Sequence, residues 1–282
     1  MPNLTDLATL RALCEKYDFT LSKGFGQNFI VNPGVCPKIV EASGIGPDMG
    51  ALEIGPGMGV LTKELAKAAR KVVAIEVDRR LPPLLEETLG EFSNVKIVLE
   101  DVLKLDLHQL LKEEFGDMPV AVAANLPYYI TSPILMKLLE ERLPIESITV
   151  MVQKEAARRI CAAPGSREAG AISYGVAYYA QPRVLFDVQP GSFYPPPKVT
   201  SSVIQLTLHK KPPVETEDEA GLFRLIRAAF SQRRKTAANS ISAGAGIPKA
   251  QVAKALEEAG LPASVRPEQL TLEDFCRLQK CL

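Results

Sequence analysis

The sequence of 282 residues contains no tryptophan, only two histidines and an odd number of cysteines, five. No two cysteines form a C-x-x-C pair, so neither a disulfide framework nor a zinc site is expected. The histidines are His108, in a leucine-rich stretch, and His209, at the end of an expected strand, and both are expected at the surface. Catalysis by imidazole or by a metal is therefore not expected.

Long apolar runs and an excess of either charge are absent as well. No apolar run approaches the roughly 20 residues of a membrane helix, and the first residues lack the basic and apolar regions of a signal peptide. We therefore expect a cytoplasmic protein with no membrane partner. Hydrophobic residues make up 46% of the chain and charged residues 23%, which excludes a disordered or fibrous protein. The length suffices for one large domain or two smaller ones.

The 33 basic and 33 acidic residues cancel in the total but are unevenly distributed. Residues 48–118 contain 14 acids and 9 bases, whereas residues 151–211 contain 8 bases and 3 acids. Residues 222–256 contain seven basic residues and no acid. Such a run often forms only a solvated helix face, but within a neutral protein it favours a surface that binds a polyanion.

Short apolar runs alternate with amphipathic stretches from residue 51 onward. This alternation predicts an α/β fold with a doubly wound, mainly parallel sheet. Two further runs, 184–188 and 203–208, predict antiparallel strands that close the sheet. The predicted parallel strands are Ala51–Ile54, Val72–Val77, Val95–Leu99, Val120–Ala124 and Ile148–Val152, with helices over 61–69, 81–89, 103–114, 133–142 and 155–162.

The segment Lys210-Lys211-Pro212-Pro213 predicts a linker, because tandem prolines continue neither a helix nor a strand. Residues 1–209 would form the α/β domain, whose first 50 residues contain one helix over 4–17 and a loop. Residues 210–282 would form a small all-helical domain. Its predicted helices cover residues 217–230, 234–243, 248–259 and 267–280.

A glycine-rich loop, residues 53–59, follows the first predicted strand and opens a helix. Gly55, Gly57 and Gly59 form the pattern G-x-G-x-G, which is typical of methyltransferases that use S-adenosylmethionine (SAM). A dinucleotide-binding enzyme would need a small residue at position 60, where this chain has Val60. A dehydrogenase is therefore the disfavoured alternative, and a glycine turn without any ligand is another.

Two carboxylates follow later strands at the same predicted edge of the sheet. Glu76 ends the next strand, about 20 residues after the glycines, at the spacing expected for an acid that holds ribose hydroxyls. Asp101 follows the third strand, where its carboxylate could accept a hydrogen bond from the adenine amine of the cofactor.

The tetrapeptide Asn125-Leu126-Pro127-Tyr128 follows the fourth predicted strand. The exocyclic amine of adenine is a poor nucleophile, because its lone pair is delocalised into the ring. An Asn oxygen and a backbone carbonyl that accept its hydrogens would aim the lone pair at a methyl donor without a general base. Pro127 would hold the Leu126 carbonyl rigid, and Tyr128 would stack a flipped base. The alternative is that the tetrapeptide merely ends a strand and turns the chain.

The whole chain resembles the small-subunit ribosomal RNA adenine dimethyltransferases of the KsgA/RsmA type. Six ordered motifs support the resemblance: 23–30 (KGFGQNFI), 53–62 (EIGPGMGVLT), 125–132 (NLPYYITS), 151–155 (MVQKE), 193–199 (FYPPPKV) and 229–236 (AFSQRRKT). The sequence departs from the family at Ile30, where leucine is more usual, and at Ala237-Ala238, where a larger and a basic residue are expected.

The resemblance implies a Rossmann-like, SAM-dependent enzyme without a metal, acting as a monomer late in ribosome biogenesis. Its substrate would be two adjacent adenosines near the 3′ end of 16S rRNA in the 30S subunit or its precursor, each receiving two methyl groups. Asn125, Leu126, Pro127 and Tyr128 would be catalytic. The cofactor would be held by Asn28, Ile30, Gly55, Gly57, Glu76, Asp101 and Asn125.

The remaining implied contacts are with the RNA. Phe193 would be a second aromatic contact, and the basic residues would bind phosphates: Lys198, Arg233, Arg234 and Lys235. Phe193 lies in a proline-rich segment that could instead be only a stiff loop. Two alternatives for the activity stay open: adenine methylation of large-subunit rRNA or DNA, and a mainly non-catalytic role in small-subunit assembly.

Overall fold

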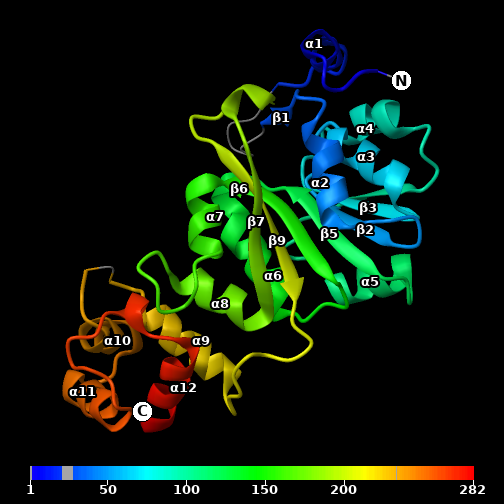
Figure 1. Cartoon of the computed structure of the whole chain (residues 1–282). Helices are drawn as coiled ribbons and strands as arrows, with labels where there is room; N and C mark the ends of the chain where they lie inside the picture. Colours follow the sequence, from blue (N-terminus) through cyan, green and yellow to red (C-terminus); the bar gives the residue numbers. More distant parts are fainter. Residues whose placement is uncertain (1, 21–27, 233) are drawn as a thin grey trace. The chain divides into compact units, whose positions relative to one another are not determined.

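The computed structural model describes residues 2–20, 28–232 and 234–282, and the chain divides into two compact units (Figure 1). One unit contains residues up to Ala157 together with Arg183–Leu208, and the other contains Arg158–Pro182 and His209–Leu282. The predicted boundary between residues 209 and 210 thus lies beside one junction between the units. The sequence did not predict that residues 158–182 belong with the C-terminal part.

The first unit is built on a seven-stranded sheet with the strand order β4-β3-β2-β5-β6-β9-β7 (Figure 1). Neighbouring strands are parallel from β4 through β3, β2 and β5 to β6, whereas β9 is antiparallel to β6. The predicted parallel strands are confirmed, and so is the antiparallel strand predicted over 203–208; the strand predicted over 184–188 forms part of β7, at the edge of the sheet beside β9. The strands are β2 (Gly50–Ile54), β3 (Lys71–Glu76), β4 (Val95–Leu99), β5 (Val120–Asn125), β6 (Ser147–Gln153), β7 (Ala180–Val188) and β9 (Ser201–Leu208).

The central strands are buried because helices cover both faces of the sheet. Every residue of β2 is buried, as expected for an apolar run in a parallel sheet. The helices are α1 (Leu7–Lys16), α2 (Val35–Ser43), α3 (Val60–Ala68), α4 (Pro82–Leu89), α5 (Leu107–Phe115), α6 (Thr131–Glu140) and α7 (Lys154–Ile160). The sequence did not predict α2. The other helices begin and end within about four residues of the prediction.

A small second sheet joins two segments that are far apart in the sequence. Strand β1 (Phe29–Ile30) pairs antiparallel with β8 (Phe193–Tyr194), and Ile30 is opposite Phe193. Neither strand was predicted, because two residues are too few to show a periodic pattern. The pairing fixes the chain immediately after Asn28, which is a predicted cofactor residue.

The second unit is all-helical in its C-terminal part, with α9 (Glu219–Ala229), α10 (Ala237–Ala245), α11 (Lys249–Glu258) and α12 (Leu272–Cys281). It also contains α8 (Ala171–Tyr179), which was not predicted. Ala237 and Ala238, the departures from the family, begin α10 as buried residues, so larger side chains there would have to displace the core. No helix in residues 2–20, 28–232 and 234–282 has the length and hydropathy to span a bilayer.

Tyr174 of α8 explains why residues 158–182 belong to the second unit. Its buried ring packs edge-on against Phe275 at a centroid distance of 5.2 Å and at a tilt of 49° against Phe230 at 5.3 Å. Its hydroxyl donates to the backbone carbonyls of Pro267 and Leu270. Aromatic burial and satisfied polar groups thus hold α8 in the core of the helical unit.

Candidate active site

A pocket lies at the carboxyl ends of the parallel strands, where doubly wound sheets bind their ligands. Its walls come from the segments that follow β2, β3, β4 and β5, and from the residues around β1. All residues predicted for the cofactor and for catalysis line it: Asn28, Ile30, Gly55, Gly57, Glu76, Asp101, Asn125, Leu126, Pro127 and Tyr128. The structure therefore brings together residues spread over a hundred positions of sequence.

The glycine loop has a backbone that other residues adopt only with strain. Gly55 has φ of 71° and Gly57 has φ of 57°, both in the left-handed region. A Cβ on Gly55 would meet no atom within 4 Å, so the backbone there is open to a ligand. A Cβ on Gly57 would lie 3.0 Å from the ring of Phe29, so close packing also demands glycine at this position.

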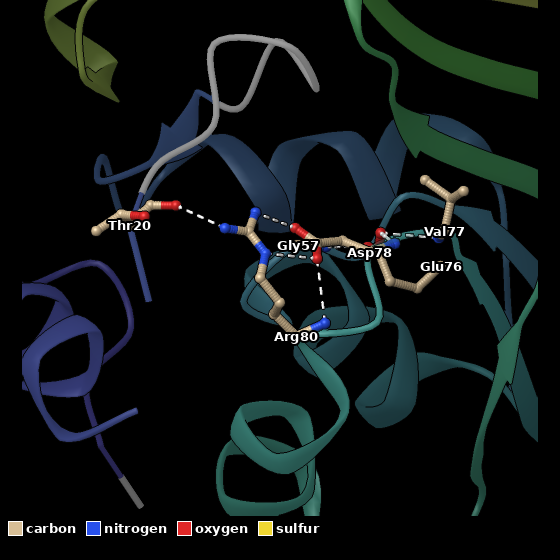
Figure 2. Close-up of polar contacts among 6 residues, drawn as sticks. All are labelled: Thr20, Gly57, Glu76, Val77, Asp78 and Arg80. Carbon is tan, nitrogen blue, oxygen red and sulfur yellow. Dashed lines mark hydrogen bonds and ion pairs between the residues drawn. The ribbon is translucent and has the colours of Figure 1, made fainter. Parts of the chain in front are cut away.

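The carboxylate of Glu76 is held by backbone amides at the end of β3 (Figure 2). One oxygen, Oε1, accepts from the amides of Val77 at 2.9 Å and Asp78 at 2.8 Å. The other, Oε2, accepts from the described residues a single long bond of 3.4 Å, from the amide of Gly57, and so retains capacity for a further donor. Burial raises the pKa of Glu76, and the three amides partly offset that rise. The geometry suits a carboxylate that receives hydroxyl donors from a ligand.

Arg80 connects this strand end to the N-terminal segment (Figure 2). Its guanidinium makes two parallel hydrogen bonds to Asp78, at 2.9 and 2.7 Å, and a third to the carbonyl of Thr20 at 3.3 Å. The same group lies 4.9 Å from the centroid of the Phe19 ring. A bidentate pair of this kind is geometrically specific, so it fixes both the strand end and the segment before residue 21.

Glu53 is the second-to-last residue of β2, just before the glycine loop, and it lines the pocket. No role was predicted for it from the sequence. Its side chain is 1% exposed, and within the described residues its Oε2 has no hydrogen-bond partner. Burial, with the nearby Glu76 charge as a smaller cause, raises the pKa of Glu53 to about 8. The signal that could have revealed it is an acid placed inside an otherwise apolar predicted strand.

Asn125 ends β5 with its side chain at the pocket. Its Nδ2 donates to the backbone carbonyl of Asn28 at 3.4 Å. This bond uses the donor side of the amide and leaves the oxygen as the acceptor that a substrate can meet. The amide of Leu126 donates to the carbonyl of Met151 on the neighbouring strand β6 at 3.2 Å. The Leu126 side chain is 1% exposed, so the residue offers the pocket its backbone.

Tyr128 begins the short helix η2 (Tyr128–Ile130) after Pro127. Its hydroxyl hydrogen-bonds to Oγ of the buried Ser201 at 2.7 Å. Burial raises the pKa of the phenol, so it remains neutral at physiological pH. With the hydroxyl anchored and the backbone restricted by Pro127, the ring is fixed before any base arrives.

The two remaining residues predicted to bind the cofactor, Asp101 and Ile30, occupy different parts of the pocket wall. Asp101 lies at the carboxyl end of β4. Its Oδ1 accepts a hydrogen bond from the amide of Leu103 at 3.0 Å, and its Oδ2 lies 3.9 Å from the Lys104 ammonium. Its carboxylate is half-buried. Ile30 is 3% exposed and contributes apolar surface from β1.

The residues predicted to contact RNA are not gathered in this pocket. Phe193 is 3% exposed and packs in the core beside Ile30, so its ring is not available for stacking without moving. Lys198, Arg234 and Lys235 are exposed. Arg233 lies outside the described residues, as do residues 23–27 of the motif 23–30. The roles of Phe193, Lys198, Arg233, Arg234 and Lys235 in RNA binding stay predictions.

The pocket fits SAM on three observations. The open backbone at Gly55 admits a ligand, the Glu76 carboxylate is aimed by three amides, and acidic rather than basic side chains surround the place of a positively charged cofactor. Within the described residues, no group of three or more histidine, cysteine or acidic side chains could hold a metal ion. A Rossmann-like sheet with this pocket defines the protein as a SAM-dependent methyltransferase.

Comparison with known proteins shows to which family of SAM-dependent methyltransferases the chain belongs. The chain belongs to the ribosomal RNA adenine dimethylase family, whose model matches residues 18–282. It is therefore a SAM-dependent rRNA adenine dimethyltransferase. A relative from Lachnoclostridium phytofermentans, named ribosomal RNA small subunit methyltransferase A, is 49% identical over 93% of this chain and 92% of its own. A relative of the same name from Shouchella clausii is 48% identical over 98% and 96%.

Two solved structures share the fold over most of the chain. A dimethyladenosine transferase from Plasmodium falciparum is 27% identical, with a TM-score of 0.71, and the match covers 88% of this chain and 95% of that one. The 23S rRNA methyltransferase ErmE is also 27% identical, with a TM-score of 0.66 and coverage of 90% and 99%. The predicted family and fold class are thus confirmed.

Proposed function

We propose that this enzyme dimethylates the exocyclic amines of two adjacent adenosines near the 3′ end of 16S rRNA. Its substrate would be the small subunit or its precursor, at a late stage of ribosome assembly in the cytoplasm, and the enzyme would act as a monomer. The observation that carries the proposal is the fixed orientation of Asn125 by Asn28 beside Leu126, Pro127 and Tyr128. The names of the relatives at 44–49% identity support the small subunit as the target.

The target adenine must leave its base stack to reach a pocket at the end of a sheet. Tyr128 offers a flat ring whose position is fixed by Ser201, so little entropy is lost when the base stacks on it. Oδ1 of Asn125 and the carbonyl oxygen of Leu126 would then accept the two hydrogens of the adenine amine. These contacts draw the nitrogen toward tetrahedral geometry and free its lone pair for attack.

SAM, when bound, would supply the electrophilic methyl group. As the amine nitrogen forms a bond to the methyl carbon, the bond from that carbon to the sulfonium sulfur breaks, and S-adenosylhomocysteine leaves. Gly55, Gly57, Glu76 and Asp101 would hold the cofactor, with Glu76 accepting from ribose hydroxyls. No side-chain base is needed before attack. After attack, the methylated nitrogen loses one proton, which can pass to water. A second round on the monomethylated amine uses the one hydrogen that remains.

The helical unit would bind RNA through its basic residues, because residues 222–256 contain no acid to repel phosphates. Arg234 and Lys235 are exposed between α9 and α10 and are the best placed described residues of the 229–236 motif. Lys198 would add a phosphate contact from the first unit. Phe193 would contribute to base contacts only after its ring leaves the core.

The decisive experiment uses labelled SAM and three substrates: unmethylated 30S particles, 50S particles and duplex DNA. We expect transfer only to 30S particles or their precursors, with the methyl groups mapped to two adjacent adenosines. The similarity to a 23S rRNA methyltransferase makes the 50S arm the essential comparison. Activity confined to 50S particles or DNA would refute the proposal, and binding to 30S without transfer would favour an assembly role.

A further inference from the structure

Tyr129 stands out among the residues that line the active-site pocket. Its side chain is 62% exposed, more than that of any other large hydrophobic residue described as exposed in the structure. The others are Val77, Leu99, Val184 and Val199, so Tyr129 is the one aromatic among them. Within the described residues its ring and hydroxyl make no hydrogen bond and no contact with another ring or cation.

The preceding residue, Tyr128, is less exposed than Tyr129, so the exposure is specific to Tyr129 and is not shared by the whole segment. Both residues belong to η2, yet Tyr128 is half-buried with its hydroxyl bonded to Ser201. Tyr129 has the same type of side chain, but it is exposed to solvent at the rim of the same pocket. Burying an aromatic ring of this size stabilises a folded protein, so an exposed ring forgoes that stabilisation. An exposed ring beside a binding pocket is typical of a stacking platform.

We propose that Tyr129 stacks on the nucleotide next to the target adenosine while the target itself occupies the pocket against Tyr128. This inference rests on the proposed function, because it needs a single-stranded RNA substrate with a base beside the target. Tyr128 and Tyr129 follow one another in η2, and both line the same pocket. Two adjacent tyrosines can therefore engage two adjacent bases.

This arrangement gives Tyr129 a defined part in the reaction. It is a positioning residue that fixes the register of the RNA, so that one base is in the pocket and the next is held outside it. Because every base has a π-face, the same platform serves whichever nucleotide lies beside the target in each of the two rounds. Stacking on an aromatic residue is worth about 1–3 kcal/mol per base, which corresponds to about 5- to 150-fold in affinity.

The test compares Tyr129→Ala, Tyr129→Phe and the control Val184→Ala, which removes exposed apolar surface on β7 away from the pocket lining. Initial rates on unmethylated 30S particles give kcat and KM, and calorimetry gives the dissociation constant for SAM. We expect Tyr129→Ala to raise KM for the particle about tenfold, with kcat within threefold and SAM affinity unchanged. Tyr129→Phe and Val184→Ala should stay within twofold of the parent enzyme.

Several outcomes would overturn the inference. An unchanged KM in Tyr129→Ala would exclude stacking, and an equal loss in Tyr129→Phe would assign the effect to the hydroxyl. Weaker SAM binding by Tyr129→Ala would assign the side chain to the cofactor. If the parent enzyme itself fails to methylate 30S particles, the proposed function fails first, and that result is visible without any variant.

Discussion

Asn125 donates a hydrogen bond from Nδ2 to the backbone carbonyl oxygen of Asn28, across 3.4 Å and 97 positions of sequence. The bond joins the end of β5 to the residue before β1, which is itself held by pairing with β8. It decides which end of the amide faces a substrate, because only the nitrogen can donate to a carbonyl. The oxygen for which we propose the catalytic role is thus oriented by a backbone group on another element.

Asn125→Ala should abolish methyl transfer, lowering kcat at least about 10²-fold, because a preorganised hydrogen-bonding group of an active site is worth that much. Binding to 30S particles should remain mostly intact, since one pocket side chain contributes little to the RNA interface. Single-turnover transfer and filter binding measure the two effects separately. Activity retained in this variant would contradict the assigned mechanism.

The matched variant Asn125→Asp tests the orientation. A carboxylate cannot donate to the Asn28 carbonyl, so two oxygens would face one another where the parent has a hydrogen bond. We expect transfer to fall as in the alanine variant, although the new side chain keeps two acceptor oxygens. Near-parent activity would show that acceptance alone matters and that the bond to Asn28 is dispensable.

Tyr128 and Ser201 should behave as a unit. Tyr128→Phe and Ser201→Ala each remove the same hydrogen bond of 2.7 Å, so each should lower kcat/KM by about three- to tenfold, consistent with about 1 kcal/mol for such a bond. The double variant should be little worse than either single one. Tyr128→Ala should be far worse, because it also removes the stacking face. Additive losses in a double-mutant cycle would show that the two residues act independently.

The sequence predicted the pocket well because the carboxyl ends of parallel strands must meet at one edge of the sheet. Glu76, Asp101 and Asn125 follow three separate apolar runs, so the fold brings them together once the strands are assigned. The features that the sequence did not predict involve long-range packing. Nothing local to Phe193 shows that it pairs with Ile30 and faces the core, since aromatic and proline residues suit a binding loop equally well.

Helix α8 was missed for a related reason. Its sequence combines Gly175 with several tyrosines, which have modest helix propensity, and shows no polar face. The helix is stable because Tyr174 and Tyr179 pack against aromatic residues of the helical unit. Tertiary contacts of this kind override local preference, and a single sequence carries no sign of them.

A comparison of Gly57→Ala with Gly55→Ala should distinguish an effect on core packing from an effect on ligand binding. Both substitutions place a side chain at positive φ, but only at Gly57 would the new Cβ lie 3.0 Å from the Phe29 ring. We therefore expect Gly57→Ala to lower the melting temperature more, by several degrees. Gly55→Ala should destabilise the fold less, through backbone strain alone, and weaken SAM binding at least tenfold, because its methyl group projects into open space at the pocket. Thermal unfolding and calorimetry provide both values, and equal SAM affinity in Gly55→Ala and the parent would contradict this account.

Arg234→Gln combined with Lys235→Gln should weaken binding to 30S particles and reduce its salt dependence. Each phosphate contact contributes to the slope of log affinity against log salt by slightly less than one, so losing two should lower the slope by about 1.5. Lys112→Gln, in the acidic half of the chain, is the matched control and should change neither value. An unchanged slope in the double variant would place the RNA-binding surface elsewhere.

Glu53 should make the stability of the free enzyme fall with rising pH. Burial raises its pKa from 4.5 to about 8, so the folded state binds a proton that the unfolded state has already released between these values. Below about pH 4.5 Glu53 makes its full contribution to the free energy of unfolding, which is at most about 5 kcal/mol. This contribution is lost as the pH approaches 8. Glu53→Gln keeps the shape of the side chain without the charge.

We therefore expect Glu53→Gln to be more stable than the parent above pH 8 and nearly equal to it at pH 5. Urea unfolding of both proteins from pH 5 to pH 9 measures the difference. Glu76→Gln is the necessary comparison, because the Glu76 charge is one cause of the raised pKa and its removal should move the transition of Glu53 to lower pH. Parallel stability curves for Glu53→Gln and the parent would show that the Glu53 carboxyl titrates in the folded protein as it does in the unfolded chain.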